Sequence, residues 1–180
     1  MTTVDIEGIL IFTPRIFTDD RGYFYESFRA DQYEDFGIIK PFVQDNQAYS
    51  TKGALRGLHY QTGDMAQAKL VRVIVGEVLD VAVDLRPNSE TYGKVYSILL
   101  SGENHKQMYV PRGFAHGYLV LSDEAIFTYK CDNYYSKQHE GGIRYDDPLL
   151  KIDWQMETAE LNISAKDLEL PYFGNHLPAI

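Results

Sequence analysis

The sequence predicts an all-β domain, folded as a sandwich or barrel of short strands. Along most of the 180 residues, apolar and polar side chains alternate in short runs, a pattern typical of strands that bury one face. Clusters of Gly, Pro, Asn and Asp separate these runs at intervals of about 8–12 residues, as in sandwiches and barrels. Aromatic residues make up 13% of the chain and favour strands, where their rings pack well.

The most regular run covers residues 78–85 (VLDVAVDL) and predicts a half-buried strand. Its alternation places four apolar side chains on one face: Leu79, Val81, Val83 and Leu85. The other face carries Val78, Asp80, Ala82 and Asp84. Less regular runs predict further strands at 8–14, 22–28, 69–75, 94–100, 106–110, 115–121 and 124–131.

Helix is scarce in this sequence. Residues 30–37 predict one or two turns, and residues 155–169 predict short helical segments around a Ser-Ala-Lys-Asp cap at 164–167. No internal repeat or linker-like segment divides the chain, so we expect a single domain spanning 1–180. After Asp147-Pro148 the pattern becomes irregular but keeps the apolar residues Trp154, Leu161 and Leu168, which indicates a tail packed on the barrel.

Charge and cysteine content exclude several classes of protein. Seventeen basic and 26 acidic residues give a net charge of −9, which opposes non-specific binding to nucleic acid or to an anionic membrane. The lone Cys131 excludes an internal disulfide framework and a multi-cysteine zinc site. The N-terminus has no signal-peptide pattern, and no apolar run approaches the roughly 20 residues of a membrane span. We therefore expect a cytoplasmic protein.

The five histidines fall into two groups. His105, His139 and His176 lie in polar loops or in the tail, where a solvated imidazole is the expected state. His59 and His116 instead lie within strand-like runs beside glycines, which permit a bulge or a close backbone approach. From the residues alone, a catalytic role and a satisfied core histidine are about equally supported for these two.

The segment Leu55-Arg56-Gly57-Leu58-His59-Tyr60-Gln61 is the most informative. In a regular pleat Arg56 and His59 would lie on opposite faces, whereas a bulge at Gly57 would bring both to one side. With Lys69 they would form a cationic cup suited to an anion or a developing oxyanion. Alternatively, Lys69 and Arg72 only border a strand, and for Arg72 we favour that interpretation.

Other chemistries find little support in the residues. A divalent metal site is improbable, because Gln61 stands where a second histidine ligand would be needed and an inward Lys69 would repel the ion. The sequence lacks dinucleotide-binding, P-loop and nucleophile-elbow motifs. The functions that remain are proton transfer by side chains and ligand binding without catalysis.

A set of motifs in order along the chain resembles the dTDP-4-dehydrorhamnose 3,5-epimerase family. The matching segments include 20–24 (DRGYF), 42–46 (FVQDN), 55–61 (LRGLHYQ), 69–73 (KLVRV), 76–86 (GEVLDVAVDLR), 111–117 (PRGFAHG), 129–130 (YK), 133–135 (NYY), 142–148 (GIRYDDP) and 164–167 (SAKD). They extend from about residue 17 to residue 170, nearly the whole chain. The resemblance implies a cupin-type β-jelly-roll barrel that forms a homodimer. It also implies an enzyme of dTDP-rhamnose biosynthesis that acts on a dTDP-4-keto-6-deoxyhexose without a cofactor or a metal.

The resemblance also implies roles for individual residues. His59 matches the catalytic base, Asp167 its carboxylate partner, Lys69 the lysine near the ketone oxygen and Tyr129 the acid on the opposite ring face. The positions that match substrate-binding residues are Phe17, Arg21, Glu26, Gln44, Asn46, Arg56, His116 and Tyr135. Because the family exchanges N-terminal strands, Phe17, Arg21 and Glu26 are expected to serve the partner subunit's site.

These residue types suit epimerisation next to a ketone. A C4 ketone acidifies the hydrogens on C3 and C5, so the site needs a base, a proton donor on the other face and a cation at the oxygen. The expected product is dTDP-4-keto-L-rhamnose. The alternatives are epimerisation at C3 or C5 alone, a non-catalytic cupin-like sugar-binding protein and, more weakly, a metal-dependent cupin oxygenase. Taken without the resemblance, Tyr129 is equally a core tyrosine and Asp167 a first-turn helix acid.

Overall fold

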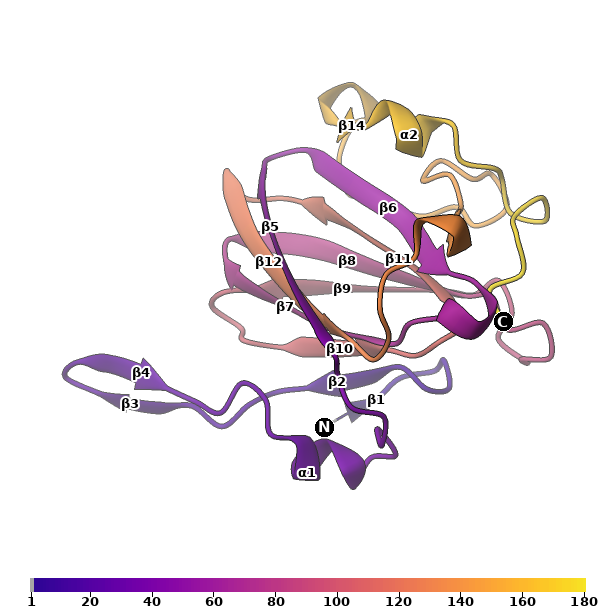
Figure 1. The fold of residues 1–180 in the computed structure, drawn as a ribbon. Coiled ribbons are helices and arrows are strands. Elements are labelled where there is room, and N and C mark those ends of the chain that lie inside the picture. The colour runs from indigo at the N-terminus through magenta and orange to yellow at the C-terminus, as the bar shows by residue number, and fades with distance from the viewer. Residues whose placement is uncertain (1) are drawn as a thin grey trace.

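The structure, a computed structural model, describes residues 2–180 as two stacked β-sheets (Figure 1). In order across the first sheet lie β1 (Thr2–Thr3), β2 (Leu10–Phe12), β10 (Gln107–Val110), β7 (Lys69–Val75), β12 (Glu124–Cys131) and β5 (Gln44–Thr51). Across the second lie β13 (Glu140–Gly142), β6 (Ala54–Gln61), β11 (Phe114–Val120), β8 (Glu77–Asp84) and β9 (Val95–Ser101). The short β14 (Asn162–Ile163) pairs in parallel with β6, and the other pairs are antiparallel. The all-β prediction is confirmed.

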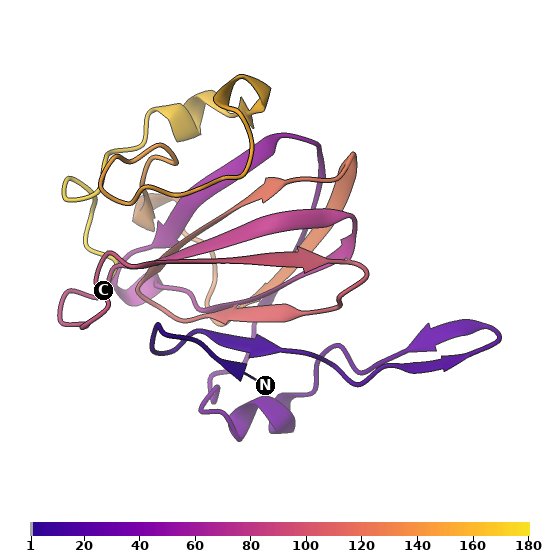
Figure 2. The same ribbon diagram turned by 180° about the vertical axis from the view of Figure 1, so that it is seen from behind.

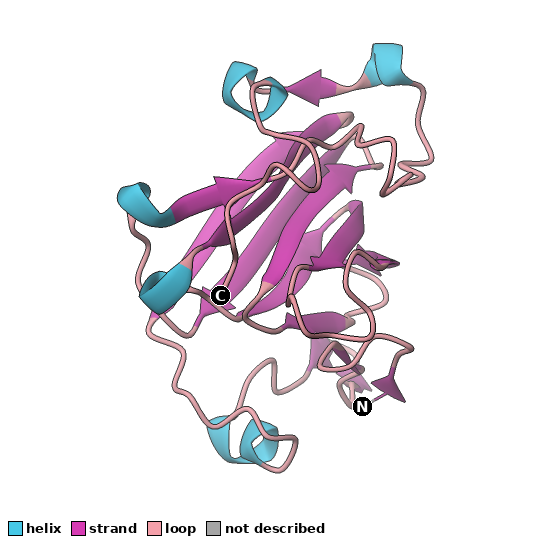
Figure 3. Ribbon diagram, turned by 90° about the vertical axis from the view of Figure 1, so that its right-hand side faces the viewer, coloured by secondary structure: helices cyan, strands magenta, loops and turns pink. Residues whose placement is uncertain are grey.

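Helices are short and lie at the periphery of the sheets (Figure 3). They comprise α1 (Ala30–Glu34), α2 (Ala165–Leu168) and single 3₁₀ turns at Gly63–Met65, Lys137–His139 and Thr158–Glu160. Both regions predicted to be helical therefore contain helix. In α2, the Ser164 hydroxyl accepts a hydrogen bond from the backbone N–H of Asp167 at 3.1 Å, which is the predicted cap. No helix within residues 2–180 is long and apolar enough to cross a membrane.

In strand β8, the alternation of side chains correctly predicted the two faces but not their burial. Its two faces contact different cores, as the alternation predicted, but every residue from Val78 to Asp84 is buried. Leu79, Val81 and Val83 face outwards from the sandwich, where the C-terminal segment covers them with Trp154 and its neighbours. The predicted half-buried strand is therefore a fully buried one, because the tail packs on the sheet.

The space between the two sheets holds the main core. Its largest fully buried side chains are Phe127, Ile9, Leu100, Met108, Val71, Val73 and Val78. Phe127 stacks on Tyr118 with ring centroids 4.1 Å apart, so the apolar core extends up to residues that line a cavity. The interior is thus apolar in one part and polar in another.

Strand β5 was not among the predicted strands, although it forms one edge of the first sheet. Its inward-facing residues are Gln44, Asn46, Ala48 and Ser50. These side chains are polar or small, so the alternating apolar signal on which strand prediction depends is missing. The reason is their position, because Gln44, Asn46 and Ala48 line a cavity rather than the apolar core.

A separate hairpin projects from the N-terminal part of the chain, away from both sheets (Figure 2). It consists of β3 (Phe17–Asp19) and β4 (Gly22–Phe24), which pair with each other in a sheet of their own. All six strand residues are exposed. We refer to residues 17–24 as the arm.

Candidate active site

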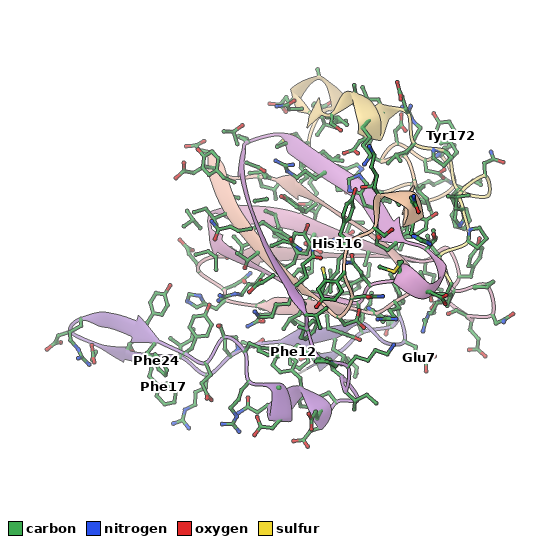
Figure 4. The ribbon with its side chains drawn as sticks, viewed as in Figure 1. Glu7, Phe12, Phe17, Phe24, His116 and Tyr172 are labelled. Carbon is green, nitrogen blue, oxygen red and sulfur yellow. The ribbon has the colours of Figure 1, made fainter. Side chains whose placement is uncertain are left out.

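Two adjacent recesses open between the sheets, with volumes of about 450 and 570 Å³. His59, Lys69, Tyr129 and Lys166 line both of them. The smaller recess continues towards Arg56, His116 and Asp167, and the larger towards Gln44, Asn46 and Tyr135. Nine of the twelve residues predicted for the site therefore line one continuous region. Figure 4 labels one of them, His116.

His59 and Asp167 form a close pair at the wall of the smaller recess. His59 Nε2 lies 2.6 Å from Asp167 Oδ1, and the backbone N–H of Gly57 donates to Asp167 Oδ2 at 3.4 Å. Since an ionised carboxylate only accepts hydrogen bonds, His59 Nε2 carries the hydrogen and Nδ1 keeps the free lone pair. The imidazole is therefore held in the tautomer that leaves Nδ1 able to act as a base.

Asp167 is positioned by the start of α2, and its carboxyl group is almost completely buried. Burial by itself would raise the pKa of Asp167, but the hydrogen bond and charge of His59, together with Gly57 and Ser164, bring it below its usual value. The carboxylate thus stays charged and keeps the imidazole oriented. Asp167 is both an acid in the first turn of α2 and the hydrogen-bond partner of His59. Its part in catalysis stays a prediction.

A bulge in β6 brings Arg56 to the same side as His59. On β11, His116 pairs with His59 and Tyr118 pairs with Arg56, so two steps along β11 match three along β6. Gly57 makes this possible with φ of +131°, and a Cβ on it would lie 2.6 Å from Gly117 Cα. Only glycine fits such a backbone approach. Of the two arrangements that the sequence left open, the bulge is the one observed.

Lys69 and Tyr129 face the recesses from the opposite sheet. They lie on the neighbouring strands β7 and β12, with Lys69 Nζ 5.9 Å from the Tyr129 ring centroid. Burial lowers the pKa of Lys69 and raises that of Tyr129. A sugar ring held between the sheets would present one face to His59 on β6 and the other to Tyr129 on β12.

A second histidine–carboxylate pair lies deeper in the smaller recess. His116 Nε2 is 2.9 Å from Asp80 Oδ1, and both side chains are buried. Burial raises the pKa of Asp80, while the nearby His116 and Lys69 act in the opposite direction. His116 thus lines the recess and pairs with a buried carboxylate, as a core histidine would. A role in catalysis or substrate binding stays a prediction for it.

The larger recess carries the groups predicted to bind the rest of the ligand. Gln44 Nε2 donates to Asn46 Oδ1 at 3.1 Å, and the backbone N–H of Tyr135 donates to Gln44 Oε1 at 3.0 Å. The Tyr135 ring is half-exposed. These contacts leave an amide-rich wall beside an open aromatic face, an arrangement that can bind the edges and faces of a nucleobase.

Lys166 and Glu140 are among the lining residues that were not predicted for the site. Lys166 Nζ forms an ion pair with Glu140 Oε2 at 2.6 Å, and Tyr135 Oη donates to Glu140 Oε1 at 2.8 Å. Glu140 follows His139 in a loop expected to be solvated, so no local pattern indicated it. Lys166 lies beside Asp167 in the 164–167 segment, and this adjacency is the one sequence feature that could have indicated Lys166 as a site residue.

Phe17, Arg21 and Glu26 do not line either recess of their own chain. Phe17 and Arg21 lie on the arm, whose outward direction Figure 4 shows at Phe17 and Phe24. The exposed Arg21 pairs only locally, with Asp19 at 2.6 Å. Their expected place in a partner's site remains a prediction.

Within residues 2–180, no three His, Cys, Asp or Glu side chains converge as metal ligands would. The expected metal-free chemistry stays a prediction.

Comparisons with known proteins agree with this geometry. The family model described as dTDP-4-dehydrorhamnose 3,5-epimerase matches residues 3–175. The Escherichia coli enzyme of that name is 52% identical over 167 residues, covering 92% of this chain and 90% of the relative.

Among solved structures, dTDP-4-dehydrorhamnose 3,5-epimerase from Elizabethkingia anophelis has 50% identity and a TM-score of 0.94, covering 97% of this chain and 96% of that one. A dTDP-6-deoxy-D-glucose-3,5-epimerase from Legionella pneumophila, solved with dTDP-4-keto-L-rhamnose, has 48% identity and a TM-score of 0.92, covering 96% and 91%. The fold is accordingly the predicted cupin-like jelly roll. By sequence, fold and the residues gathered between its sheets, the chain belongs to the dTDP-4-dehydrorhamnose 3,5-epimerase family.

Proposed function

We propose that this chain epimerises dTDP-4-keto-6-deoxyglucose at C3 and C5, giving dTDP-4-keto-L-rhamnose without a cofactor. The observation that carries the proposal is the cavity with His59–Asp167 on one sheet and Tyr129 and Lys69 on the other. Epimerisation inverts a carbon by removing a proton from one face and returning one to the other. A base and an acid on opposing walls supply both steps.

The chemistry follows from these positions. His59 Nδ1 takes the proton from C3 or C5, and the electron pair of the broken C–H bond moves into the enolate, leaving negative charge on the C4 oxygen. The Lys69 ammonium stabilises that charge, and this electrostatic stabilisation is stronger in a buried site than in water. Tyr129 then gives its hydroxyl proton to the carbon from the other face. Asp167 stabilises the imidazolium formed in the first step, as in other His–Asp pairs.

The nucleoside diphosphate is expected to lie along Arg56 and the larger recess. Arg56 lies at the edge of the smaller recess and offers a guanidinium for bidentate contact with a phosphate. Tyr135 offers a stacking surface for thymine, with Gln44 and Asn46 at its edge. Because the substrate carries a nucleotide, we also place the reaction in the cytoplasm.

A homodimer completes this site. The arm is a two-stranded hairpin with exposed Phe17, Tyr23 and Phe24, and such a hairpin alone is marginally stable in water. Lying on a second copy would bury these rings and bring Arg21 near the recess of that copy. Dimerisation would therefore both bury the exposed rings of the arm and supply Arg21 as a phosphate-binding group.

The test is to incubate the protein with dTDP-4-keto-6-deoxyglucose in D₂O and to follow the sugar protons by NMR. Loss of the C3 and C5 proton signals with the wild type, abolished by His59→Ala and retained by the control His176→Ala, whose side chain lines neither recess, supports the proposal. Exchange at one carbon would make the chain a single-position epimerase. No exchange with retained substrate binding would leave a sugar-binding protein.

A further inference from the structure

His105 is buried at the root of the arm, contrary to the solvated loop imidazole expected from the sequence. Only 8% of the residue is exposed. Its ring centroid lies 4.8 Å from that of Tyr23 and 5.0 Å from that of Tyr25. Tyr23 belongs to β4 and Tyr25 follows it, so the imidazole contacts the arm where it leaves the body of the molecule.

The turn that presents His105 is internally braced. Asn104 Oδ1 accepts from the backbone N–H groups of Ser101 and Lys106 at 3.1 and 2.9 Å, and Asn104 Nδ2 donates to Leu99 O at 3.0 Å. The Ser101 hydroxyl accepts from Asn104 N at 3.0 Å. His105 itself has φ of +51°, a conformation that a non-glycine residue keeps only when its surroundings fix it. The hydrogen-bonded turn therefore fixes the position of the His105 imidazole.

Arg72 ties the same root to the strand that carries Lys69. Its Nη1 donates to Tyr25 Oη at 2.9 Å, and it lies on β7 three positions after Lys69. Arg72 borders the strand as expected, and its charged end holds the arm root. The orientation of the arm is thereby linked to the body that contains the cavity.

We propose that His105, Tyr25 and Arg72 form an arm clamp, which sets the direction of the arm and so places Phe17 and Arg21 in the cavity of a second copy. This role rests on the proposed function. The clamp residues act by positioning and touch no reacting atom. A pre-directed hairpin loses less conformational freedom on binding than a loose one, so the clamp should strengthen nucleotide binding without changing the chemical step.

The test compares His105→Ala, His105→Phe and Tyr25→Phe with the wild type. Removing two aromatic contacts should raise KM for the dTDP-sugar and Kd for dTDP roughly tenfold, with kcat within about twofold. His105→Phe keeps a flat ring and should recover most of the affinity. Tyr25→Phe loses only the hydroxyl that Arg72 binds and should have a smaller effect of the same kind. Trypsin cleavage after Arg21 should be faster in His105→Ala than in the wild type.

The matched control is His176→Ala, which removes a histidine stacked on Phe173 in the tail, far from the arm. Unchanged KM and Kd in both His105→Ala and Tyr25→Phe would overturn the clamp, as would a fall in kcat with unchanged KM. If His105→Ala fails to fold, His105→Phe and Tyr25→Phe still decide. Wild-type protein that exchanges neither C3 nor C5 would refute the proposed function, while Kd for dTDP would still measure the clamp.

Discussion

His59 and Asp167 are separated by 108 positions in the chain, yet their side chains meet at 2.6 Å. Each residue type alone has an ordinary structural explanation, a core histidine and a helix-cap acid. What gives them chemical value is the combination of a buried carboxylate, a half-exposed imidazole and a cavity beside both. The carboxylate fixes which ring nitrogen is free, and that nitrogen determines whether the residue can act as a base.

At this scale we predict the effect of Asp167→Asn on activity. The amide still accepts a hydrogen bond from His59 but has no charge to stabilise an imidazolium. We therefore expect the rates of C3 and C5 exchange to fall by about 10²-fold or more, within the range that general base catalysis contributes. Asp146→Asn is the control, because that carboxylate also has a lowered pKa but pairs with Arg144 outside the cavity. Equal losses in both variants would contradict the role of Asp167.

The same carboxylate predicts a pH dependence of stability. The pKa of Asp167 in the folded chain lies below its usual 3.8, so the unfolded state binds this proton more readily. Its stabilisation is therefore complete above about pH 4 and is lost as the pH falls through the lowered folded pKa. Urea unfolding between pH 2 and pH 5 should show a flatter pH dependence for Asp167→Asn than for the wild type. An identical slope would contradict this linkage.

At the scale of elements, the bulge in β6 decides which side chains share the cavity. Without the extra residue, the pleat would turn Arg56 away from His59. Gly57 and Gly117 allow it because their backbones approach more closely than any Cβ permits. A local irregularity of one residue thus sets the composition of the site.

We predict that Gly57→Ala disrupts this element. The added Cβ would meet Gly117 Cα at 2.6 Å with φ at +131°, so we expect a loss of roughly 2–3 kcal/mol of unfolding free energy and a large fall in kcat. The control is Gly63→Ala, where φ is +55° and no atom lies within 4 Å of the added Cβ. That variant should lose only about 1 kcal/mol, and equal losses measured by urea unfolding would refute the packing argument.

At the scale of the whole molecule, the arm separates part of the predicted site from the body of its own chain. His59, Lys69 and Tyr129 line the recesses of their own chain, while Phe17 and Arg21 lie on a hairpin that projects from the body. In the proposed homodimer, the substrate is bound completely only when the second copy contributes its arm. The proposed clamp at His105 belongs to this scale, because its expected effect is to direct the arm of one chain towards the other.

We predict complementation between two inactive variants, His59→Ala and Arg21→Ala. In a mixed dimer, one site carries both defects and the other combines an intact His59 with an intact arm. Co-expressed in equal amounts, half of the dimers should be mixed, giving about a quarter of wild-type activity at limiting substrate. The control pair His59→Ala and Lys69→Ala should recover nothing, because Lys69 lies in the same chain's cavity as His59. No recovery with the first pair would contradict arm exchange.

The fold class, most strands and both helical regions were predictable from the sequence, because alternation and capping are local properties. Strand β5 escaped because its inward side chains are polar where they line the cavity. The solvated state expected for His105 was wrong, because nothing within its polar turn indicates that Tyr23 and Tyr25 pack against it. Glu140 was missed for the same reason, since its partners Tyr135 and Lys166 converge on it only in the folded chain.

The sequence by itself therefore determined the alternating strands, the capped α2, the glycines that permit the bulge and the set of motifs that carries the family resemblance. The tertiary structure alone decided that β8 is buried on both faces, that His59 meets Asp167, and that acid and base lie on opposing sheets. The physical reason is the distance along the chain over which each kind of interaction acts. Propensity and periodicity act between residues a few positions apart, whereas burial, pairing and cavity shape depend on residues brought together from distant parts of the chain.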